Sequence, residues 1–274
     1  MTLRIAWLTT GRGPGSYGAL EYVCKAIASG LPVEIATVFL NRAPGEAEPT
    51  DRLIEMAKGH GCHVETLSSV AFRKSRGGAV SRPGEPLHPW RLEYDKAVAN
   101  VLAGHDFDVG VMFGYMLIAA EPLFGRFRFI NDHPALPGGP IGTYQEVIAQ
   151  LIDARAIESG CMMNTVTGNV DRGPALSYCR FPIRDATNEA LWSQHDFGAS
   201  RKQLETSLLY LDIRRRGVER ERPFLVETLR AVAQGELPLT ADSPLDLTEV
   251  VEQTLNMPGT SGQRERSGVS SRHA

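Results

Sequence analysis

The first third of the chain alternates short apolar runs with stretches whose apolar residues recur at helical spacing. Apolar runs occupy residues 3–10, 33–40 and 63–67, and helical patterns fill residues 19–30 and 50–61 between them. Runs of this length predict strands, and the periodic stretches predict amphipathic helices. Strands that alternate with helices are typical of a mostly parallel sheet with helices on both faces. We therefore predict a Rossmann-like α/β fold.

The remaining pattern extends this sheet and then becomes helical. A long loop, rich in Gly, Pro and Arg, is predicted for residues 72–89. The later predicted elements are a helix at 90–104, strands within 107–118 and 127–134, a helix at 143–159, two strands in 160–183, and helices at 199–216 and 223–235. We expect a main domain over residues 1–183, a helical extension packed on it over 184–257, and a disordered tail over 258–274, where Gly, Ser and Arg leave little to bury.

Composition narrows the classes of partner. The chain has 274 residues, 42% of them hydrophobic, and a formal net charge of −3. Such a charge gives no bulk attraction to nucleic acid or to an anionic membrane. No run reaches the roughly 20 apolar residues that a membrane helix needs, and the N-terminus lacks the features of a signal peptide. We expect a cytoplasmic location and small-molecule partners, with no nucleic acid and no membrane, and the sequence leaves a homodimer open.

Four cysteines, at positions 24, 62, 161 and 179, are spread without a CxxC pair. This spacing predicts buried thiols rather than a zinc site or a disulfide framework. No metal-ligand cluster is recognisable in the sequence, so no metal is expected.

A glycine-rich segment, TGRGPGSYG, follows the first predicted strand and opens the first helix. Glycines let backbone amides approach a ligand, and a helix N-terminus favours an anion. The spacing is neither that of a Walker loop nor a clean G-x-G-x-x-G, and no acidic residue ends the second strand to hold an adenosine ribose. A tight turn and an anion site both remain open, while a nicotinamide oxidoreductase is disfavoured.

Asn131 and His133 lie at the carboxyl end of a predicted strand, where ligands gather in open α/β sheets. If the strand continues that far, both side chains point to the same face. Asp171 lies in a turn between two later strands, and its proximity to His133 cannot be decided from the sequence.

Four segments together resemble the folate-dependent formyltransferases, most closely the branch of phosphoribosylglycinamide formyltransferases. They are GRGPGSYG, NDHP, GCMMNTV and VDRGP, in this order. The resemblance runs from about residue 3 to 183 and implies the Rossmann-like fold of that family. It also implies that the domain at 1–183 is the catalytic domain.

The resemblance also implies site residues. Asn131, His133 and Asp171 match the catalytic residues. A second set matches the wall and the edge of the pterin pocket: Phe113, Gly114, Tyr115, Met116, Ile118, Val166, Thr167 and Asn169. A third set matches substrate contacts: Gly11, Arg12, Gly13, Gly15, Ser16, Arg91, Pro134 and Glu221, of which Arg91 would hold a phosphate.

The implied reaction is formyl transfer from 10-formyltetrahydrofolate, as co-substrate, to a primary amine. Attack on the formyl carbon creates an oxyanion that needs preorganised donors. Asn131 would donate from its amide and His133 from a protonated imidazole. Asp171 would orient His133 and accept, directly or through water, the proton that the amine loses. This chemistry needs neither a metal nor a nucleophilic side chain.

Departures from the family pattern concern the acceptor side. Asn164 stands where the family usually has His, and Leu117 where many relatives have Arg. We expect formyl transfer to glycinamide ribonucleotide or a related amine. The alternatives are an amino sugar nucleotide or secondary-metabolite amine as acceptor, hydrolysis of the formyl group, and a folate-binding relative without catalysis. A methionyl-tRNA formyltransferase is disfavoured because the C-terminal region reads as helical rather than as a β-rich RNA-binding domain.

Overall fold

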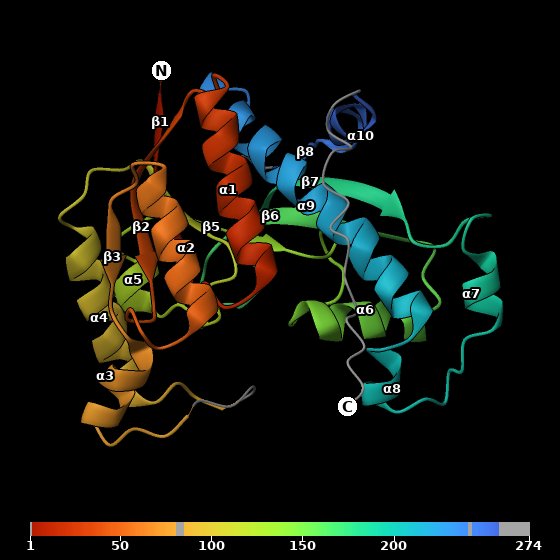
Figure 1. The fold of residues 1–274 in the computed structure, drawn as a ribbon, viewed down its shortest axis with the longest axis horizontal. Coiled ribbons are helices and arrows are strands. Elements are labelled where there is room, and N and C mark those ends of the chain that lie inside the picture. Colours follow the sequence, from red (N-terminus) through yellow and green to blue (C-terminus); the bar gives the residue numbers. More distant parts are fainter. Residues whose placement is uncertain (1, 81–84, 241–242, 258–274) are drawn as a thin grey trace, which may run out of the picture.

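The computed structural model describes residues 2–80, 85–240 and 243–257, and an eight-stranded sheet organises them (Figure 1). The strand order is β3-β2-β1-β4-β5-β6-β7-β8. The strands are β1 (Leu3–Thr9), β2 (Val33–Leu40), β3 (Val64–Thr66), β4 (Val109–Met112), β5 (Phe129–His133), β6 (Glu158–Thr165), β7 (Ala175–Pro182) and β8 (Leu245–Asp246).

The first five strands are parallel, and β6 then runs antiparallel to both β5 and β7. Strand β8 is parallel to β7. The predicted mostly parallel α/β sheet is therefore confirmed. Because β1, β4 and β5 are parallel, the loops that leave their carboxyl ends meet at one edge of the sheet.

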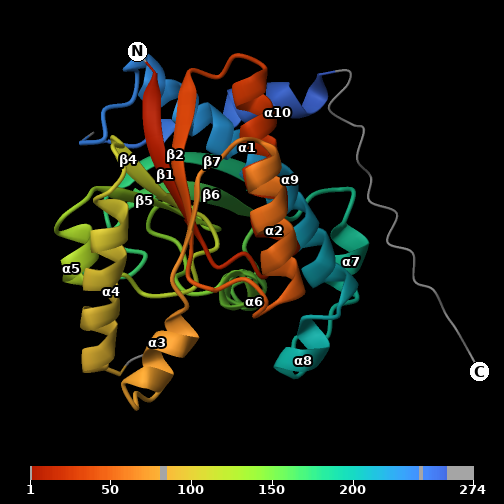
Figure 2. The same ribbon diagram turned by 60° about the vertical axis from the view of Figure 1, so that its left-hand side comes forward.

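Helices cover both faces of the sheet (Figure 2). One face carries the larger core, beneath α1, α2, α6, α9 and α10. The other carries a smaller core, beneath α4 and α5. The helices are α1 (Pro14–Ala28), α2 (Glu48–Gly59), α3 (Ser69–Ser75), α4 (Pro89–Leu102), α5 (Glu121–Phe124), α6 (Tyr144–Asp153), α7 (Glu189–Ser193), α8 (Arg201–Leu204), α9 (Leu208–Gln234) and α10 (Thr248–Asn256).

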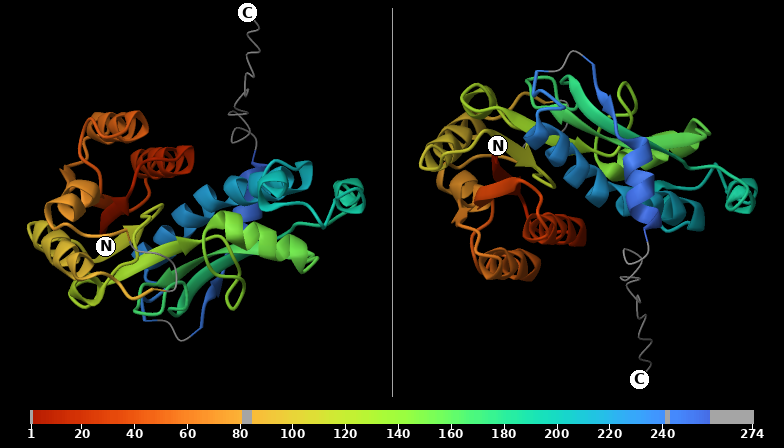
Figure 3. Two further views of the ribbon diagram at one scale, coloured as in Figure 1. Left: turned by 90° about the horizontal axis from the view of Figure 1, so that it is seen from below. Right: turned by 90° about the horizontal axis from the view of Figure 1, so that it is seen from above.

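The C-terminal segment is helical, as predicted, but its division into helices was wrong. Helix α9 runs unbroken through Pro223, obliquely across the sheet (Figure 3), where two helices were expected. Proline removes one intrahelical hydrogen bond, but the neighbouring Phe224 and Leu225 are fully buried, and their packing holds the helix together. The break lies earlier, at Ser207, whose hydroxyl accepts a hydrogen bond from the Tyr210 amide and caps α9.

Of the loop predicted for residues 72–89, the first four residues belong to α3 instead. The Ser68 hydroxyl caps α3 by accepting from the Ala71 amide. Phe72 then packs edge-on against Tyr94 of α4, with ring centroids 5.3 Å apart. The tail predicted for residues 258–274 lies outside the described residues, and the domain boundary at residue 183 stays a prediction. Among the described helices, none is long and apolar enough to span a membrane.

Candidate active site

The loops that follow β1 and β4 are hydrogen-bonded to each other at the carboxyl edge of the sheet. The Thr10 amide donates to the Gly114 carbonyl at 3.0 Å, and the Met116 amide donates to the Thr10 hydroxyl at 2.9 Å. Gly114 has φ +65°, and a Cβ there would lie 2.3 Å from the Ser16 hydroxyl of α1. Only glycine meets both requirements, so this junction fixes where α1 begins relative to β4.

The glycine-rich segment forms the N-terminus of α1. Gly13 is the N-cap and provides no side-chain cap, so the first amides of α1 remain available for an anion. An unexpected guanidinium lies nearby: Nη2 of Arg214, on α9, is 4.0 Å from the position of a Cβ on Gly15. Arg12 is exposed, and Gly11 is a buried turn residue with φ +68°. A helix N-terminus beside a guanidinium can hold a phosphate.

His133 is buried at the end of β5, with an oxygen near each ring nitrogen. Its Nδ1 lies 3.7 Å from Oδ1 of Asp171, and its Nε2 lies 2.9 Å from the Pro140 carbonyl oxygen. The first distance is too long for a hydrogen bond, and the second is a hydrogen bond in which Nε2 must be the donor. The β6–β7 turn thus brings Asp171 to His133, which the sequence left open.

Asn131 and Asn164 are directly paired across β5 and β6. Residues opposite each other in an antiparallel pair lie on the same face. His133 is two residues beyond Asn131 on the same strand, so its side chain also points to this face. Asn164 is 2% exposed, and its Oδ1 is buried without a hydrogen-bond partner. Asn164 therefore places a buried amide beside Asn131 on this face.

The β6–β7 turn carries the other predicted folate contacts. Asp171 has φ +54°, a left-handed conformation that is uncommon outside glycine. Thr167 accepts a hydrogen bond from the Asn169 amide at 3.2 Å, and Val166 packs against the smaller core. The Gly142 amide lies 3.4 Å from Oδ2 of Asp171. The turn is held in shape by these contacts while Asn169 stays exposed.

The segment predicted to form the pterin wall divides into buried and exposed side chains. Phe113 is buried against Trp7, with ring centroids 5.8 Å apart, and Tyr115 is 8% exposed in the smaller core. Met116 and Ile118 are 66% and 41% exposed. In this structure Met116 and Ile118 are the more accessible to a ligand.

Arg91 is buried behind this segment rather than open to solvent. It donates to the Ile118 carbonyl at 2.6 Å and forms an ion pair with Asp95 at 3.3 Å. Its Nη1 is buried without a hydrogen-bond partner. Burial raises the pKa of the Asp95 carboxyl to about 6, against the opposing effect of Arg91. Arg91 thus joins α4 to the β4–α5 loop, and its phosphate role stays a prediction.

Pro134 and Glu221 line one small cavity of about 20 Å³ behind β6, together with Tyr144 and Arg214. The Arg214 guanidinium donates to Glu221 at 2.9 Å and lies 4.1 Å above the Tyr144 ring. A cavity of this size has room for about one water molecule and for no larger ligand. Glu221 is thus linked to the glycine-rich segment through Arg214.

Asp132, which no sequence pattern singled out, is half-buried, with one carboxylate oxygen fully buried. It lies between Asn131 and His133 but on the opposite face of β5, toward α9, and its Oδ1 has no hydrogen-bond partner. Burial, followed by the charge of Glu221, raises the pKa of Asp132 well above its usual range, and Arg214 opposes this rise. The polar cluster under the candidate site thus includes Arg214, which no sequence spacing indicated.

A larger concavity of about 420 Å³ lies over α1 and α2 and is lined by Tyr17, Arg52 and His60, among others. It contains none of the predicted catalytic residues. We locate the candidate active site at the sheet edge because His133, Asp171 and the glycine-rich segment converge there.

The family described as formyl transferase matches residues 4–197. A curated relative, the phosphoribosylglycinamide formyltransferase of Mycobacterium tuberculosis, is 31% identical over 104 residues, which cover 37% of this chain and 47% of the relative. The chain thus spans about half the length of the curated relatives that it matches.

Solved structures share the fold. Glycinamide ribonucleotide transformylase 1 from Symbiobacterium toebii aligns with a TM-score of 0.62 at 23% identity, covering 89% of this chain and 92% of that chain. Phosphoribosylglycinamide formyltransferase from Coxiella burnetii aligns with a TM-score of 0.59 at 19% identity, covering 86% and 89%. At these identities the likeness concerns the fold.

Proposed function

This chain belongs to the formyl transferase family, and on that premise we propose that it transfers a formyl group from 10-formyltetrahydrofolate to a primary amine. The approach of Asp171 to His133 at the carboxyl edge of the sheet carries the proposal. A carboxylate and an imidazole, with Asn131 on the same face of β5, form the set of groups that an acyl transfer through an oxyanion needs.

Asn131, His133 and Asp171 each have a defined role in the proposed mechanism. The amine attacks the formyl carbon, and the carbonyl electrons move to oxygen, where the Asn131 amide and the protonated His133 imidazole donate hydrogen bonds. Asp171 orients His133 and accepts the proton from the attacking nitrogen, directly or through water. The tetrahydrofolate nitrogen then leaves as the carbonyl re-forms, and it takes up the proton that Asp171 accepted, directly or through water.

The Pro140 carbonyl occupies the ring nitrogen of His133 that this mechanism uses. It accepts the hydrogen bond from His133 Nε2, and it belongs to the loop between β5 and α6. Donation from Nε2 to the oxyanion requires that this carbonyl give way when the substrates bind. The same loop approaches Asp171 through the Gly142 amide, so one displacement would affect both catalytic side chains.

We propose glycinamide ribonucleotide as the acceptor. The support is the anion site that the N-terminus of α1 and Arg214 would form, which suits a phosphate, and the similarity to enzymes that act on glycinamide ribonucleotide. For the folate, Met116, Ile118 and the turn at Thr167 and Asn169 would contact the pterin. An amino sugar nucleotide or secondary-metabolite amine as acceptor, hydrolysis of the formyl group, and folate binding without catalysis remain the alternatives.

A binding and turnover experiment separates these functions. We expect calorimetry to detect binding of a folate analogue, and absorbance to report release of the folate product only when glycinamide ribonucleotide is present. Product release without any amine would identify a deformylase. Binding without turnover would support another acceptor or a non-catalytic relative. Absence of folate binding would contradict the proposal.

A further inference from the structure

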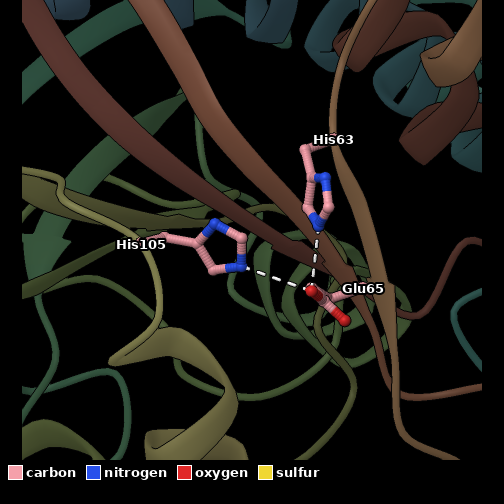
Figure 4. A group of neighbouring side chains, drawn as sticks. All are labelled: His63, Glu65 and His105. Atoms are coloured by element: carbon pink, nitrogen blue, oxygen red, sulfur yellow. Dashed lines mark hydrogen bonds and ion pairs between the residues drawn. The ribbon is translucent and has the colours of Figure 1, made fainter.

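Two histidines and a glutamate converge near the amino ends of β3 and β4, at the opposite end of these strands from the candidate active site (Figure 4). His63 precedes β3 and Glu65 lies within it, so their side chains share one face of that strand. His105 lies in the connection between α4 and β4. Since β3 and β4 have the same direction in the sheet, this cluster lies toward their amino ends, whereas His133 lies at the carboxyl end of β5.

The three side chains point toward one another. His63 Nε2 lies 2.9 Å from Glu65 Oε1, and His105 Nε2 lies 3.4 Å from the same oxygen. One potential ligand atom from each residue lies within 4.8 Å of the others. In a tetrahedral site with metal–ligand bonds of about 2.1 Å, ligand atoms are separated by about 3.4 Å. Small side-chain rotations therefore suffice to place all three atoms around one ion.

From this geometry, we propose that His63, Glu65 and His105 bind a divalent transition-metal ion, with Zn²⁺ as the reference case. Two imidazoles and one carboxylate are ligands that suit Zn²⁺, whereas Ca²⁺ and Mg²⁺ prefer oxygen ligands throughout. The side chains of His63, Glu65 and His105 are 59%, 35% and 16% exposed. An ion can enter from solvent, and water can fill the remaining coordination position.

The ion would join two parts of the chain that are far apart in sequence. Strand β3 has three residues and forms the edge of the sheet, and within the described part of the chain it is paired only with β2. His105 belongs to the loop that connects α4 to β4. A ligand that binds only the native state stabilises it by mass action. We therefore expect the metal to raise the thermal stability of the protein and to hold the edge strand.

The test uses tag-free full-length protein, stripped with EDTA and titrated with Zn²⁺ by calorimetry. We expect one ion per chain and a rise in Tm on binding. The affinity for Zn²⁺ should fall by about a hundredfold in His63→Ala and in His105→Ala, because removing even a residue that only hydrogen-bonds to a metal ligand typically costs about 10- to 100-fold. His60→Ala is the matched control, because His60 is exposed, close in sequence and outside the cluster. Co²⁺ titration followed by visible absorption should give a tetrahedral spectrum in the wild type.

Two results would overturn the proposal. If the wild type binds Zn²⁺ no more tightly than the double variant His63→Ala/His105→Ala, the cluster is only a carboxylate hydrogen-bonded to two imidazoles. If the double variant keeps a stoichiometric site with the wild-type Tm shift, the ion binds elsewhere. Neither readout depends on formyl transfer.

Discussion

His133 Nδ1 and Asp171 Oδ1 lie 3.7 Å apart, slightly beyond hydrogen-bonding distance, at the carboxyl edge of the sheet. The contact joins β5 to the turn between β6 and β7. At this distance the two groups are close to each other but not hydrogen-bonded. Catalytic hydrogen bonds are often long in a ligand-free site and shorten when the substrates bind.

The first prediction concerns Asp171. Asp171→Asn should lower turnover by about 10²- to 10³-fold, because a positioned general base contributes about 10²–10⁴. Binding of a folate analogue and the thermal stability should be nearly unchanged, since asparagine tolerates the left-handed backbone conformation of this position. Steady-state kinetics and calorimetry check this, with the exposed Asp153→Asn as the control. Unchanged turnover in Asp171→Asn would remove the proton-shuttle role.

The second prediction concerns Arg214, the guanidinium near the N-terminus of α1. Its loss should raise the acceptor KM by about tenfold to a hundredfold, the effect of one charge-assisted hydrogen bond. Because truncation alone would strand the buried Glu221 carboxylate, Arg214→Ala should be measured in a Glu221→Gln background and compared with Glu221→Gln alone. The neighbouring Arg215→Ala, on the exposed side of α9, is a further control. Equal acceptor KM values for Glu221→Gln and for the double variant Arg214→Ala/Glu221→Gln would show that Arg214 does not bind the phosphate.

The third prediction concerns Gly114. Gly114→Ala combines a left-handed backbone with an approach of 2.3 Å to the Ser16 hydroxyl, so it should destabilise the protein by about 2 kcal/mol or more. It should also weaken acceptor binding, because the junction positions α1. Gly59→Ala is the contrasting variant: Gly59 is the last residue of α2, has no positive φ and has open space around it. In urea unfolding, the free energy of unfolding of Gly114→Ala should be well below that of the wild type, and that of Gly59→Ala should be equal to the wild-type value or higher.

The fourth prediction concerns the pH dependence of stability. The pKa of Asp95 is raised to about 6 in the folded protein, so the native state binds this proton more tightly than the unfolded chain does. The resulting stabilisation is complete below the unfolded pKa of about 3.8 and is lost as pH rises through 6, a change of about 3 kcal/mol.

In the variant Asp95→Asn the side chain cannot ionise, so this contribution to the pH dependence of the unfolding free energy is absent. Between pH 7 and pH 4.5, the unfolding free energy of the wild type should therefore rise relative to that of Asp95→Asn. Urea unfolding of both proteins at several pH values measures the difference. A constant difference across this window would contradict the raised pKa.

Much of the sheet could be predicted because its signals are local. The runs at 3–10 and 33–40 and the periodic stretch that follows each of them depend only on burial and spacing, and they became β1, α1, β2 and α2. The unbroken α9 was missed because Pro223 is a local helix breaker, while the packing of Phe224 and Leu225 that overrides it is tertiary. Helix α3 was missed because it has seven residues and one serine cap.

The candidate site could likewise be predicted only where its signals are local. Asn131 and His133 could be placed on one face from strand alternation alone. The approach of Arg214 to Gly15 and the cluster of His63, Glu65 and His105 join segments remote in sequence, and no spacing along the chain encodes such contacts. A short motif such as His-x-Glu in an edge strand is recognisable as a ligand pair only when the third side chain is in place.

The most direct test of the central proposal is the rate of formyl transfer from 10-formyltetrahydrofolate to glycinamide ribonucleotide, followed by absorbance of the released folate. The wild type and the surface control His60→Ala should turn over at equal rates. His133→Ala should lose about 10²–10³ in rate, the cost of removing one oxyanion donor, while still binding a folate analogue. Equal turnover by His133→Ala and the wild type would contradict the mechanism, and absence of turnover in the wild type would contradict the proposed acceptor.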